Sequence, residues 1–357
     1  MYSNTPEYNV IGIMSGTSLD GLDLAACTFH SVDSHWTYAI VTAETLPYPS
    51  ELKEQLSGLF AADARHFSQF HTLYGHYLGE QVANFTKKTG FAAHFVDSHG
   101  HTIFHDTKAG FTTQIGDGAA IAIQSSLPVV CDFRTSDVAA GGQGAPLVPI
   151  GDKLLFGNYD ACLNLGGIAN ISMDHQNQRI AFDICPVNMA LNYLTQQLGL
   201  DFDADGAIAR SGKTIQKTLD ALKALDYFSQ PFPKTLGREW FETEMLPLLQ
   251  TDEPNRIPDI LHTCVHLAAA EIASNLNHFK LKNVLITGGG AFNTFLIDCI
   301  RQQTDCKIIL PDPMLINFKE ALVFAFLGVL RWTQQANCLA SVTGASKNVA
   351  GGAIYLP

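Results

Sequence analysis

Short apolar runs that end in glycine-rich turns recur along this chain and limit the folds that it can adopt. Residues 10–13 and 22–29 flank the turn at 15–21, and residues 162–165 lead into a second glycine turn at 166–170. Stretches with helical periodicity lie between such runs. This mixture of strands, tight turns and helices predicts an α/β fold. The two strand–turn–strand segments share little identity, but they suggest two similar α/β lobes with a cleft between them.

A glycine-rich segment at residues 139–149 is the best candidate for a boundary between the lobes. We therefore predict an N-terminal lobe of residues 1–138 and a C-terminal lobe of residues 139–357. The last apolar helix, residues 320–334, is assigned to the second lobe unless it packs back on the first.

The composition limits the classes of function. Of 357 residues, 46% are apolar and 16% are charged, less than the roughly 25% that is typical, so large cores are expected. The 34 Asp and Glu outnumber the 22 Lys and Arg, giving a net charge of −12, which argues against nucleic-acid binding. The longest apolar run, residues 321–330, is shorter than the about 20 residues that span a membrane. With no signal sequence in residues 1–9, we expect a cytoplasmic protein with no membrane or nucleic-acid partner.

The cysteine and histidine patterns favour neither a disulfide framework nor a metal centre. The eight cysteines form no C-x-x-C pair and lie mostly in apolar stretches, as expected of reduced, buried thiols. Histidines cluster at residues 94–105, and His262 and His266 lie four apart without the Glu of an H-E-x-x-H zinc site. Ordinary polar or core histidines are therefore the favoured interpretation.

The turn at residues 15–21 offers the first candidate ligand site. Its glycines allow close backbone approach, and its serines and threonine add hydroxyl groups around a potential anion nest. Asp20 and Asp23 would repel a bare phosphate but suit one that carries Mg²⁺. A plain hairpin turn with Asx and Ser/Thr caps explains the same residues equally well.

Four further features could carry chemistry. Glycine turns at residues 164–170 and 287–293 could contact a phosphate and a ribose or base, respectively. A plain β-turn explains the first equally well, whereas three consecutive glycines favour a ligand at the second. Asp183 ends an apolar strand and could act as a base, although a helix cap is the commoner explanation. Arg134 could bind a ligand carboxylate, but an ion pair with one of two neighbouring aspartates is favoured.

Taken in order, these segments resemble the anhydro-N-acetylmuramic acid kinase family. The resemblance covers nearly the whole chain and rests on residues 14–23, 99–105, 114–117, 132–134, 141–149, 164–170 and 287–293. It implies the fold of the sugar kinase, Hsp70 and actin superfamily, with two ribonuclease-H-like lobes around an ATP cleft. It also implies that water opens the 1,6-anhydro bond of 1,6-anhydro-N-acetylmuramate and that ATP phosphorylates the freed O6. The product would be N-acetylmuramate 6-phosphate, in peptidoglycan recycling.

The resemblance implies roles for individual residues. Asp183 matches the catalytic base that activates water, and Glu320 matches a second acidic residue near that water. The residues matched to ATP are Gly16, Thr17, Ser18, Leu19, Asp20, Gly21, Leu22, Asp23, Gly166, Gly167, Gly288, Gly289 and Gly290. Mg²⁺ would bind Asp20 and Asp183, directly or through water. The candidates for binding the sugar, including its lactyl carboxylate, are His99, His101, Arg134, Gln143 and Asn170.

The chain departs from the family pattern next to Asp183. Ile184 and Cys185 stand where the family has a hydroxyl residue and a glycine, and His101 stands where a Gln is common. These changes keep two alternatives open: a kinase of another sugar or sugar acid on the same fold, and a nucleotide or muropeptide sensor without turnover. The oligomeric state, monomer or homodimer, is open as well.

Overall fold

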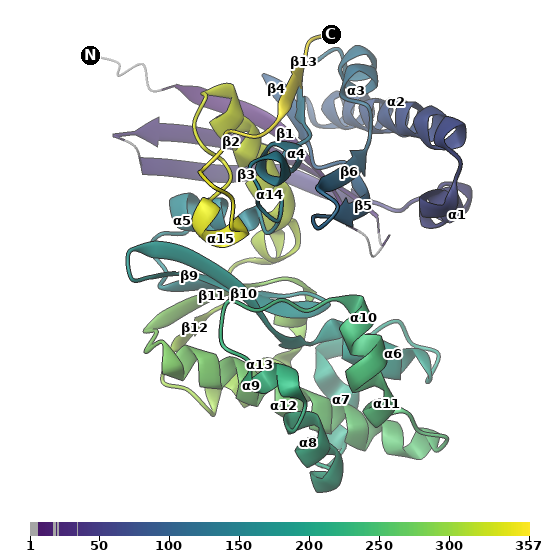
Figure 1. Ribbon diagram of the computed structural model, residues 1–357, viewed down its shortest axis with the longest axis vertical. Coiled ribbons are helices and arrows are strands. Elements are labelled where there is room, and N and C mark those ends of the chain that lie inside the picture. Colours follow the sequence, from purple (N-terminus) through teal and green to yellow (C-terminus); the bar gives the residue numbers. More distant parts are fainter. Residues whose placement is uncertain (1–5, 17–18, 20, 34) are drawn as a thin grey trace. The chain divides into compact units, whose positions relative to one another are not determined.

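The computed structural model describes residues 6–16, 19, 21–33 and 35–357. The chain folds into two compact units (Figure 1): unit 1 comprises residues 1–156 and 318–357, and unit 2 comprises residues 157–317. The division therefore differs from the predicted boundary at 138/139, because the glycine-rich segment is part of unit 1. Asp137 accepts hydrogen bonds from Gly144 N and from Thr343 Oγ1, both at 2.8 Å, which anchor this segment within unit 1.

Unit 1 is built on a six-stranded mixed sheet with the order β13-β7-β4-β1-β2-β3. Its strands are β1 (Glu7–Ser15), β2 (Leu22–Val32), β3 (His35–Leu46), β4 (Phe95–Ser98), β7 (Val129–Cys131) and β13 (Ala353–Tyr355). Strands β1, β2 and β3 are antiparallel, β1, β4 and β7 are parallel, and β13 adds an antiparallel edge. A separate hairpin pairs β5 (His101–Asp106) with β6 (Phe111–Ile115).

Helices cover both faces of this sheet because the residues of β1 alternate between them. Ile11 and Ile13 pack in a core with the long helix α2, whereas Gly12 faces α14, where a Cβ would overlap Ala321 O. Figure 1 shows α2 beside α3. The helices of unit 1 are α1 (Ser50–Gly58), η1 (Leu59–Ala61), α2 (Ala64–Thr89), α3 (Gly118–Ser125), α4 (Thr135–Ala139), α5 (Val148–Leu155), α15 (Ala340–Thr343) and most of α14 (Pro313–Trp332).

Helix α14 contains the longest apolar run of the sequence. Its 20 residues are long and apolar enough to cross a membrane, but 78% of its most apolar window is buried inside the protein. That burial is typical of a core helix. The eight cysteines are likewise buried and free, as the sequence predicts.

Unit 2 repeats the strand order of unit 1 on a smaller scale. Its sheet has the order β10-β9-β8-β11-β12, with β8 (Ala161–Leu165), β9 (Ile168–His175), β10 (Gln178–Pro186), β11 (Asn283–Thr287) and β12 (Lys307–Ile309). The first three strands are antiparallel, and β8, β11 and β12 are parallel. Both units thus have a ribonuclease-H-like sheet, and the predicted fold class is confirmed.

The core of unit 2 lies between this sheet and the buried face of α12. Leu163 and Leu165 of β8 belong to the same buried core as Leu261, Val265 and Ile272 of α12. The remaining helices are α6 (Asn188–Gln196), η2 (Ala204–Gly206), α7 (Ala207–Ser211), α8 (Gln216–Lys223), α9 (Asp226–Ser229), α10 (Arg238–Trp240), η3 (Phe241–Met245), α11 (Leu246–Leu249), η4 (Pro254–Arg256), α12 (Ile257–His278), η5 (Gly289–Phe292) and α13 (Thr294–Arg301).

Candidate functional site

The first candidate turn connects β1 and β2 in unit 1. Ser15 and Leu22 are paired residues at the ends of the two strands, and Leu19 N donates to Gly16 O at 3.1 Å within the connection. A Cβ on Gly21 would lie 2.8 Å from Leu46 O, so this glycine is required by packing against β3. Leu22 is fully buried and belongs to the core of unit 1, so its predicted contact with a ligand has no exposed surface. The predicted residues Thr17, Ser18 and Asp20 lie outside the described residues.

Asp23 is anchored to the sheet beside this turn. It pairs with Thr45 across β2 and β3, and Thr45 Oγ1 donates to Asp23 Oδ1 at 2.6 Å. Its negative charge contributes to the raised pKa of Glu320. The two carboxylates that the sequence assigned to different roles are therefore electrostatically coupled within unit 1.

Glu320 lies on α14 among charged groups. Its side chain keeps exposed surface. The pKa of Glu320 is nevertheless raised, first by desolvation and then by the negative charge of Asp23. The positive charges of Lys319 and Arg134 oppose this shift. The neighbouring Lys319 is buried and forms an ion pair with Asp152 of α5 at 2.7 Å. A carboxyl group with a raised pKa between two cations is suited to exchange a proton or to orient a polar ligand.

Arg134 binds a histidine rather than a carboxylate. Its Nη2 and Nε lie 2.8 and 3.3 Å from His99 Nε2, and its Nη1 donates to Gly144 O at 2.7 Å. Among the described residues it forms no ion pair with Asp132 or Asp137, contrary to the favoured sequence interpretation. Desolvation, and then the Arg134 charge, lower the pKa of His99 to about 3. His99 is therefore a neutral acceptor. Burial lowers the pKa of Arg134 to about 10, so Arg134 keeps its positive charge at neutral pH.

The other predicted sugar-binding residues of unit 1, His101 and Gln143, have different partners. His101 of β5 is buried, with its Nδ1 2.8 Å from Ser15 Oγ. Gln143 is exposed, and its Oε1 accepts a hydrogen bond from Thr107 Oγ1 at 2.8 Å. This contact ties the glycine-rich segment to the β5–β6 hairpin.

In unit 2, three motifs from distant parts of the sequence form one polar row. Asp183 of β10 pairs with Asn170 of β9, Asn170 pairs with Asn164 of β8, and Asn164 pairs with Thr287 of β11. Directly paired residues project from the same face of a sheet. The row therefore lies on one face, away from the core residues Leu163 and Leu165.

The carboxylate of Asp183 is held by backbone groups. Leu236 N donates to its Oδ2 at 2.8 Å, Asp183 N donates to Lys234 O at 2.9 Å, and Tyr227 OH donates to Asp183 O at 2.7 Å. Burial raises the pKa of Asp183, and the Leu236 amide opposes the shift. The result is a fixed, half-buried carboxylate that is a stronger base than an exposed aspartate.

The two residues beside Asp183 that differ from the family pattern are buried in the core of unit 2. A bulge separates Asp183 and Cys185 in the pairing with β9, and Ile184 and Cys185 are 1% and 0% exposed in the core of unit 2. The bulky side chains therefore point away from the polar row. Ile184 and Cys185, which led us to consider a sensor without turnover, therefore leave the Asp183 carboxyl in place.

Sequence reasoning missed the segment that holds Asp183. Lys234 Nζ donates to Tyr227 O at 2.9 Å and lies 4.4 Å from the centre of the Tyr227 ring. Desolvation lowers the pKa of Lys234, opposed chiefly by the negative charge of Glu271. The only signal in the sequence is the Pro-Phe-Pro-Lys run that ends at Lys234, which lacks strand or helix periodicity.

The glycine turn after β8 prepares the start of helix α6. Gly167 O accepts from Val187 N and Met189 N, and Gly166 O accepts from Asn188 N. Gly167 is exposed. The turn therefore has a structural role at the end of β10 and still presents free backbone at its surface.

Packing explains two of the three consecutive glycines after β11. A Cβ on Gly288 would overlap Asn164 Oδ1, and a Cβ on Gly290 would lie 2.7 Å from Leu165 Cβ. Gly289, by contrast, is exposed, and its nearest neighbour would be Asn188 Nδ2 at 3.6 Å. Of the three, Gly289 is the position that leaves room for a ligand.

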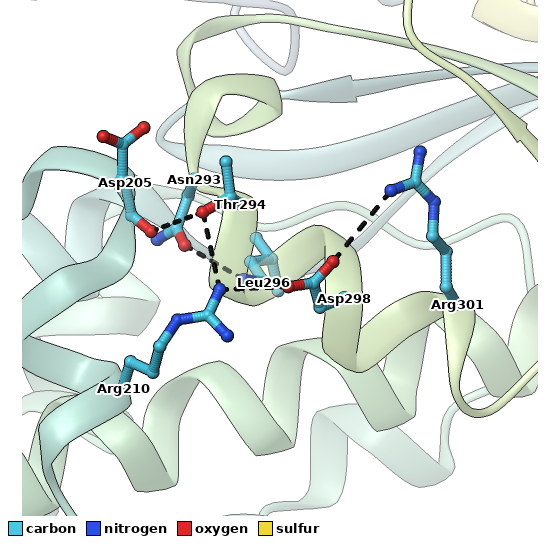
Figure 2. A network of polar contacts seen from close by, with 7 residues as sticks. All are labelled: Asp205, Arg210, Asn293, Thr294, Leu296, Asp298 and Arg301. Atoms are coloured by element: carbon cyan, nitrogen blue, oxygen red, sulfur yellow. Dashed lines mark hydrogen bonds and ion pairs between the residues drawn. The ribbon is translucent and has the colours of Figure 1, made fainter.

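A polar network fixes the helix that follows these glycines (Figure 2). Arg210 Nη2 of α7 lies 3.0 Å from Asp298 Oδ2 and 3.5 Å from Thr294 Oγ1 of α13. Asn293 caps α13 by accepting from Leu296 N at 2.9 Å. The network joins α7 to α13 and thereby holds the glycine turn from its far end.

Two ribonuclease-H-like units, one with a glycine turn between its first two strands and the other with a carboxylate inside its third strand, define a protein with the fold of the sugar kinase, Hsp70 and actin superfamily. Within that class, the chain belongs to the anhydro-N-acetylmuramic acid kinase family, because the family model of that description matches residues 8–357.

Individual relatives agree with this assignment. The chain is 35% identical to the anhydro-N-acetylmuramic acid kinase of Francisella tularensis subsp. novicida, covering 96% of this chain and 97% of the relative. It is also 35% identical to that of Saccharophagus degradans, covering 97% and 98%. Among solved structures, the activator of a 2-hydroxyisocaproyl-CoA dehydratase from Clostridium difficile with bound ADPNP has a TM-score of 0.44 and 15% identity, covering 91% of this chain and 97% of the activator.

Proposed function

We propose that this chain is an ATP-dependent kinase that hydrolyses the 1,6-anhydro bond of 1,6-anhydro-N-acetylmuramate and phosphorylates O6. The product is N-acetylmuramate 6-phosphate, in cytoplasmic recycling of peptidoglycan. Membership of the family supports this substrate, and the observation that carries the chemistry is the setting of Asp183. Its carboxylate is fixed by a backbone amide and desolvated, as a general base requires.

The reaction joins two substitutions, one at C1 of the sugar and one at the γ-phosphorus of ATP, to one proton transfer. Water attacks C1 while Asp183 takes its proton, so that a C1–OH bond forms and the C1–O6 bond breaks with its electron pair on O6. The freed O6 attacks the γ-phosphorus of ATP, and ADP leaves. Asp183 then releases the proton to solvent. Because Oδ2 holds the Leu236 amide, Oδ1 is the oxygen proposed to accept the proton from water.

Residues of unit 1 are proposed to orient the attacking water and to bind the sugar. Glu320, with its raised pKa, is proposed to orient the attacking water. Arg134 binds the lactyl carboxylate of the sugar, because its positive charge is met by the neutral His99 and a carbonyl oxygen. Gln143 and His101 are proposed to contact the sugar from the same unit, and Asn170 from the polar row of unit 2.

The nucleotide is proposed to bind through glycine turns. The backbone of Gly16–Asp23 takes the phosphates, joined by Gly166 and Gly167, and the exposed Gly289 with its two neighbours lies against the adenosine. Asp183 fits Mg²⁺ in its donor chemistry, because Mg²⁺ prefers carboxylate and phosphate oxygens, and Asp20 is its proposed second ligand. When bound, Mg²⁺ would neutralise the phosphate charge in this acidic protein.

A coupled assay of ADP release tests the proposal. Release should require 1,6-anhydro-N-acetylmuramate, and mass spectrometry should identify a product heavier than the substrate by one water and one phosphoryl group. N-acetylmuramate is the matched control, because it has the same substituents without the anhydro bond. A panel of sugars and sugar acids covers the alternative kinase. ATP binding without turnover on any sugar would overturn the proposal in favour of a sensor.

A further inference from the structure

Four side chains of unit 1 form a buried hydrogen-bonded chain next to the β1–β2 turn. Tyr74 of α2 lies 2.8 Å from the hydroxyl of Tyr48, Tyr48 OH donates to Ser15 Oγ at 2.7 Å, and Ser15 Oγ lies 2.8 Å from His101 Nδ1. Their exposed fractions are 0% for Tyr74, 9% for Tyr48, 1% for Ser15 and 4% for His101. The chain joins β1, α2, β5 and the β3–α1 connection beside Ser15, whose neighbour Gly16 opens the proposed phosphate turn. The proposed reaction assigns no step to either tyrosine.

The order of donors along the chain determines the tautomer of His101. Tyr48 has one hydroxyl proton, which it gives to Ser15, so Tyr74 is the donor between the two tyrosines. Ser15 Oγ is hydrogen-bonded to Tyr48 and His101, and its own proton is therefore directed at Nδ1 of the imidazole. Burial lowers the pKa of His101 to about 4, so that the ring is neutral at physiological pH. Its one proton then lies on Nε2.

This imidazole stands within the polar neighbourhood already described. The proximity of His101 contributes to the lowered pKa of His99, and His99 accepts the hydrogen bonds of Arg134. Arg134 in turn acts on the pKa of Glu320. A neutral N–H donor at this place adds the ability to bind an oxygen acceptor without adding charge.

We propose that Tyr48 is a positioning residue that, through Ser15, fixes His101 as a neutral Nε2–H donor to an oxygen of the bound ligand. The acceptor is a sugar oxygen or a phosphate oxygen. The identity of the ligand rests on the proposed function, whereas the tautomer of His101 does not.

Two phenylalanine variants form a matched pair. Tyr48→Phe removes the hydroxyl that donates to Ser15. Tyr74→Phe removes a buried hydroxyl from the same chain but leaves the contact between Tyr48 and Ser15 intact. Tyr48→Phe loses two buried hydrogen bonds and Tyr74→Phe loses one, so both variants should lose stability, and unfolding is measured to confirm that each is folded under the assay conditions. A difference in kinetics between them then reports the positioning of Ser15 and His101.

Steady-state kinetics measure the consequence. We expect kcat/KM to fall about tenfold or more in Tyr48→Phe, equivalent to about 1.4 kcal/mol, and less than about threefold in Tyr74→Phe. A larger effect on the KM of the sugar places the acceptor on the sugar, and a larger effect on the KM of ATP places it on a phosphate. Equal losses in the two variants would overturn the proposal.

Substitutions at His101 provide the rescue test. His101→Gln should retain most activity, because its amide oxygen can accept from Ser15 while its amide nitrogen donates. His101→Leu should lose at least as much kcat/KM as Tyr48→Phe. A His101→Leu variant as active as the parent would contradict the proposal.

Nitrogen NMR of the imidazoles tests the tautomer without any turnover. The His101 resonances are assigned by their disappearance in His101→Gln. We expect an unprotonated Nδ1 and a protonated Nε2 in the parent and in Tyr74→Phe, and a loss of this preference in Tyr48→Phe. A protonated Nδ1 in the parent would refute the inference, even if the kinase activity is confirmed. Conversely, the expected tautomer in a protein without kinase activity would place the failure in the proposed function.

Discussion

Two aspartates that look alike in the sequence occupy opposite environments in the structure. Asp183 of unit 2 and Asp97 of unit 1 each lie in an apolar strand, and burial raises the pKa of both. Asp97 is fully buried, and neither of its carboxyl oxygens has a hydrogen-bond partner among the described residues. Asp183 is half-buried and accepts the Leu236 amide.

The difference explains why Asp183, and not Asp97, is the proposed base. Asp183 keeps access to solvent and is held by a donor, so that its ionised form exists in a fixed position. Asp97 lies in the space left by Gly328 of α14, where a Cβ would overlap its Oδ2. Its pKa is raised well above the usual value by desolvation, opposed by the nearby Gly328 amide. Asp97 is therefore a core group in which burial favours the protonated form.

The largest expected effect separates the two aspartates in turnover. Asp183→Asn removes the base while keeping the shape of the side chain, and kcat should fall by about 10²–10⁴. Asp97→Asn should leave kcat within about threefold of the parent. Coupled ADP release measures both variants, and circular dichroism confirms that each is folded. Similar kcat values for the two variants would contradict the proposed difference in role between Asp183 and Asp97.

The pH profile of kcat/KM sharpens the assignment of the base. Asp183 acts when ionised, so activity should fall as pH decreases through its pKa. Because burial raises that pKa, the acid limb should lie above the ordinary value of about 3.9, with a tenfold loss per pH unit below it. An acid limb at or below about 3.9, in a protein that stays folded there, would contradict the assignment.

Gly328 should be intolerant of a side chain as long as Asp97 is present. Gly328→Ala places a methyl group against the Asp97 carboxyl and should cost about 1–3 kcal/mol of folding free energy. In an Asp97→Ala background the same change should cost less, because the space is then free. Denaturant unfolding of the four proteins gives the coupling energy, and a value of zero would show that the two residues do not compete for space.

A smaller effect, on the pH dependence of stability, is expected from replacing Asp97 by Asn, which does not titrate. A folded-state pKa above the unfolded value means that stability falls as pH rises from the unfolded pKa of about 3.9 towards the folded pKa. Asp97→Asn abolishes this loss, so the variant should gain stability relative to the parent as pH rises, by about 1.4 kcal/mol for each unit of pKa difference. Thermal unfolding at acidic and neutral pH measures it. A gain that is the same at both pH values would mean that Asp97 does not titrate in this range.

The sequence predicted the fold and singled out Asp183 as a candidate base, but it did not predict the contacts that hold Asp183. Alternating runs and glycine turns are local patterns, and they predict ribonuclease-H-like strands because each strand is defined by its own residues. Leu236 and Lys234 reach Asp183 from a segment 53 and 51 residues away, with no periodicity of its own. Tyr48 and His101 meet Ser15 in the same way, across 33 and 86 residues.

The boundary between the lobes also depends on contacts that local sequence patterns do not predict. A glycine-rich segment usually indicates a linker, but residues 139–149 are anchored by Asp137, which also binds Thr343, 206 residues further along the chain. Contacts of that separation leave no trace in a single sequence. The consecutive glycines after β11 were attributed to a ligand, whereas packing against Asn164 and Leu165 accounts for two of the three.

The most direct test of the account follows heavy oxygen from labelled water into the product. With 1,6-anhydro-N-acetylmuramate and ATP, the parent and Asp97→Asn should form N-acetylmuramate 6-phosphate with the label bonded to C1 and none on O6. Asp183→Asn should form almost no labelled product. Label at O6, or undiminished formation of C1-labelled product by Asp183→Asn, would contradict the role of Asp183 as the base that activates water.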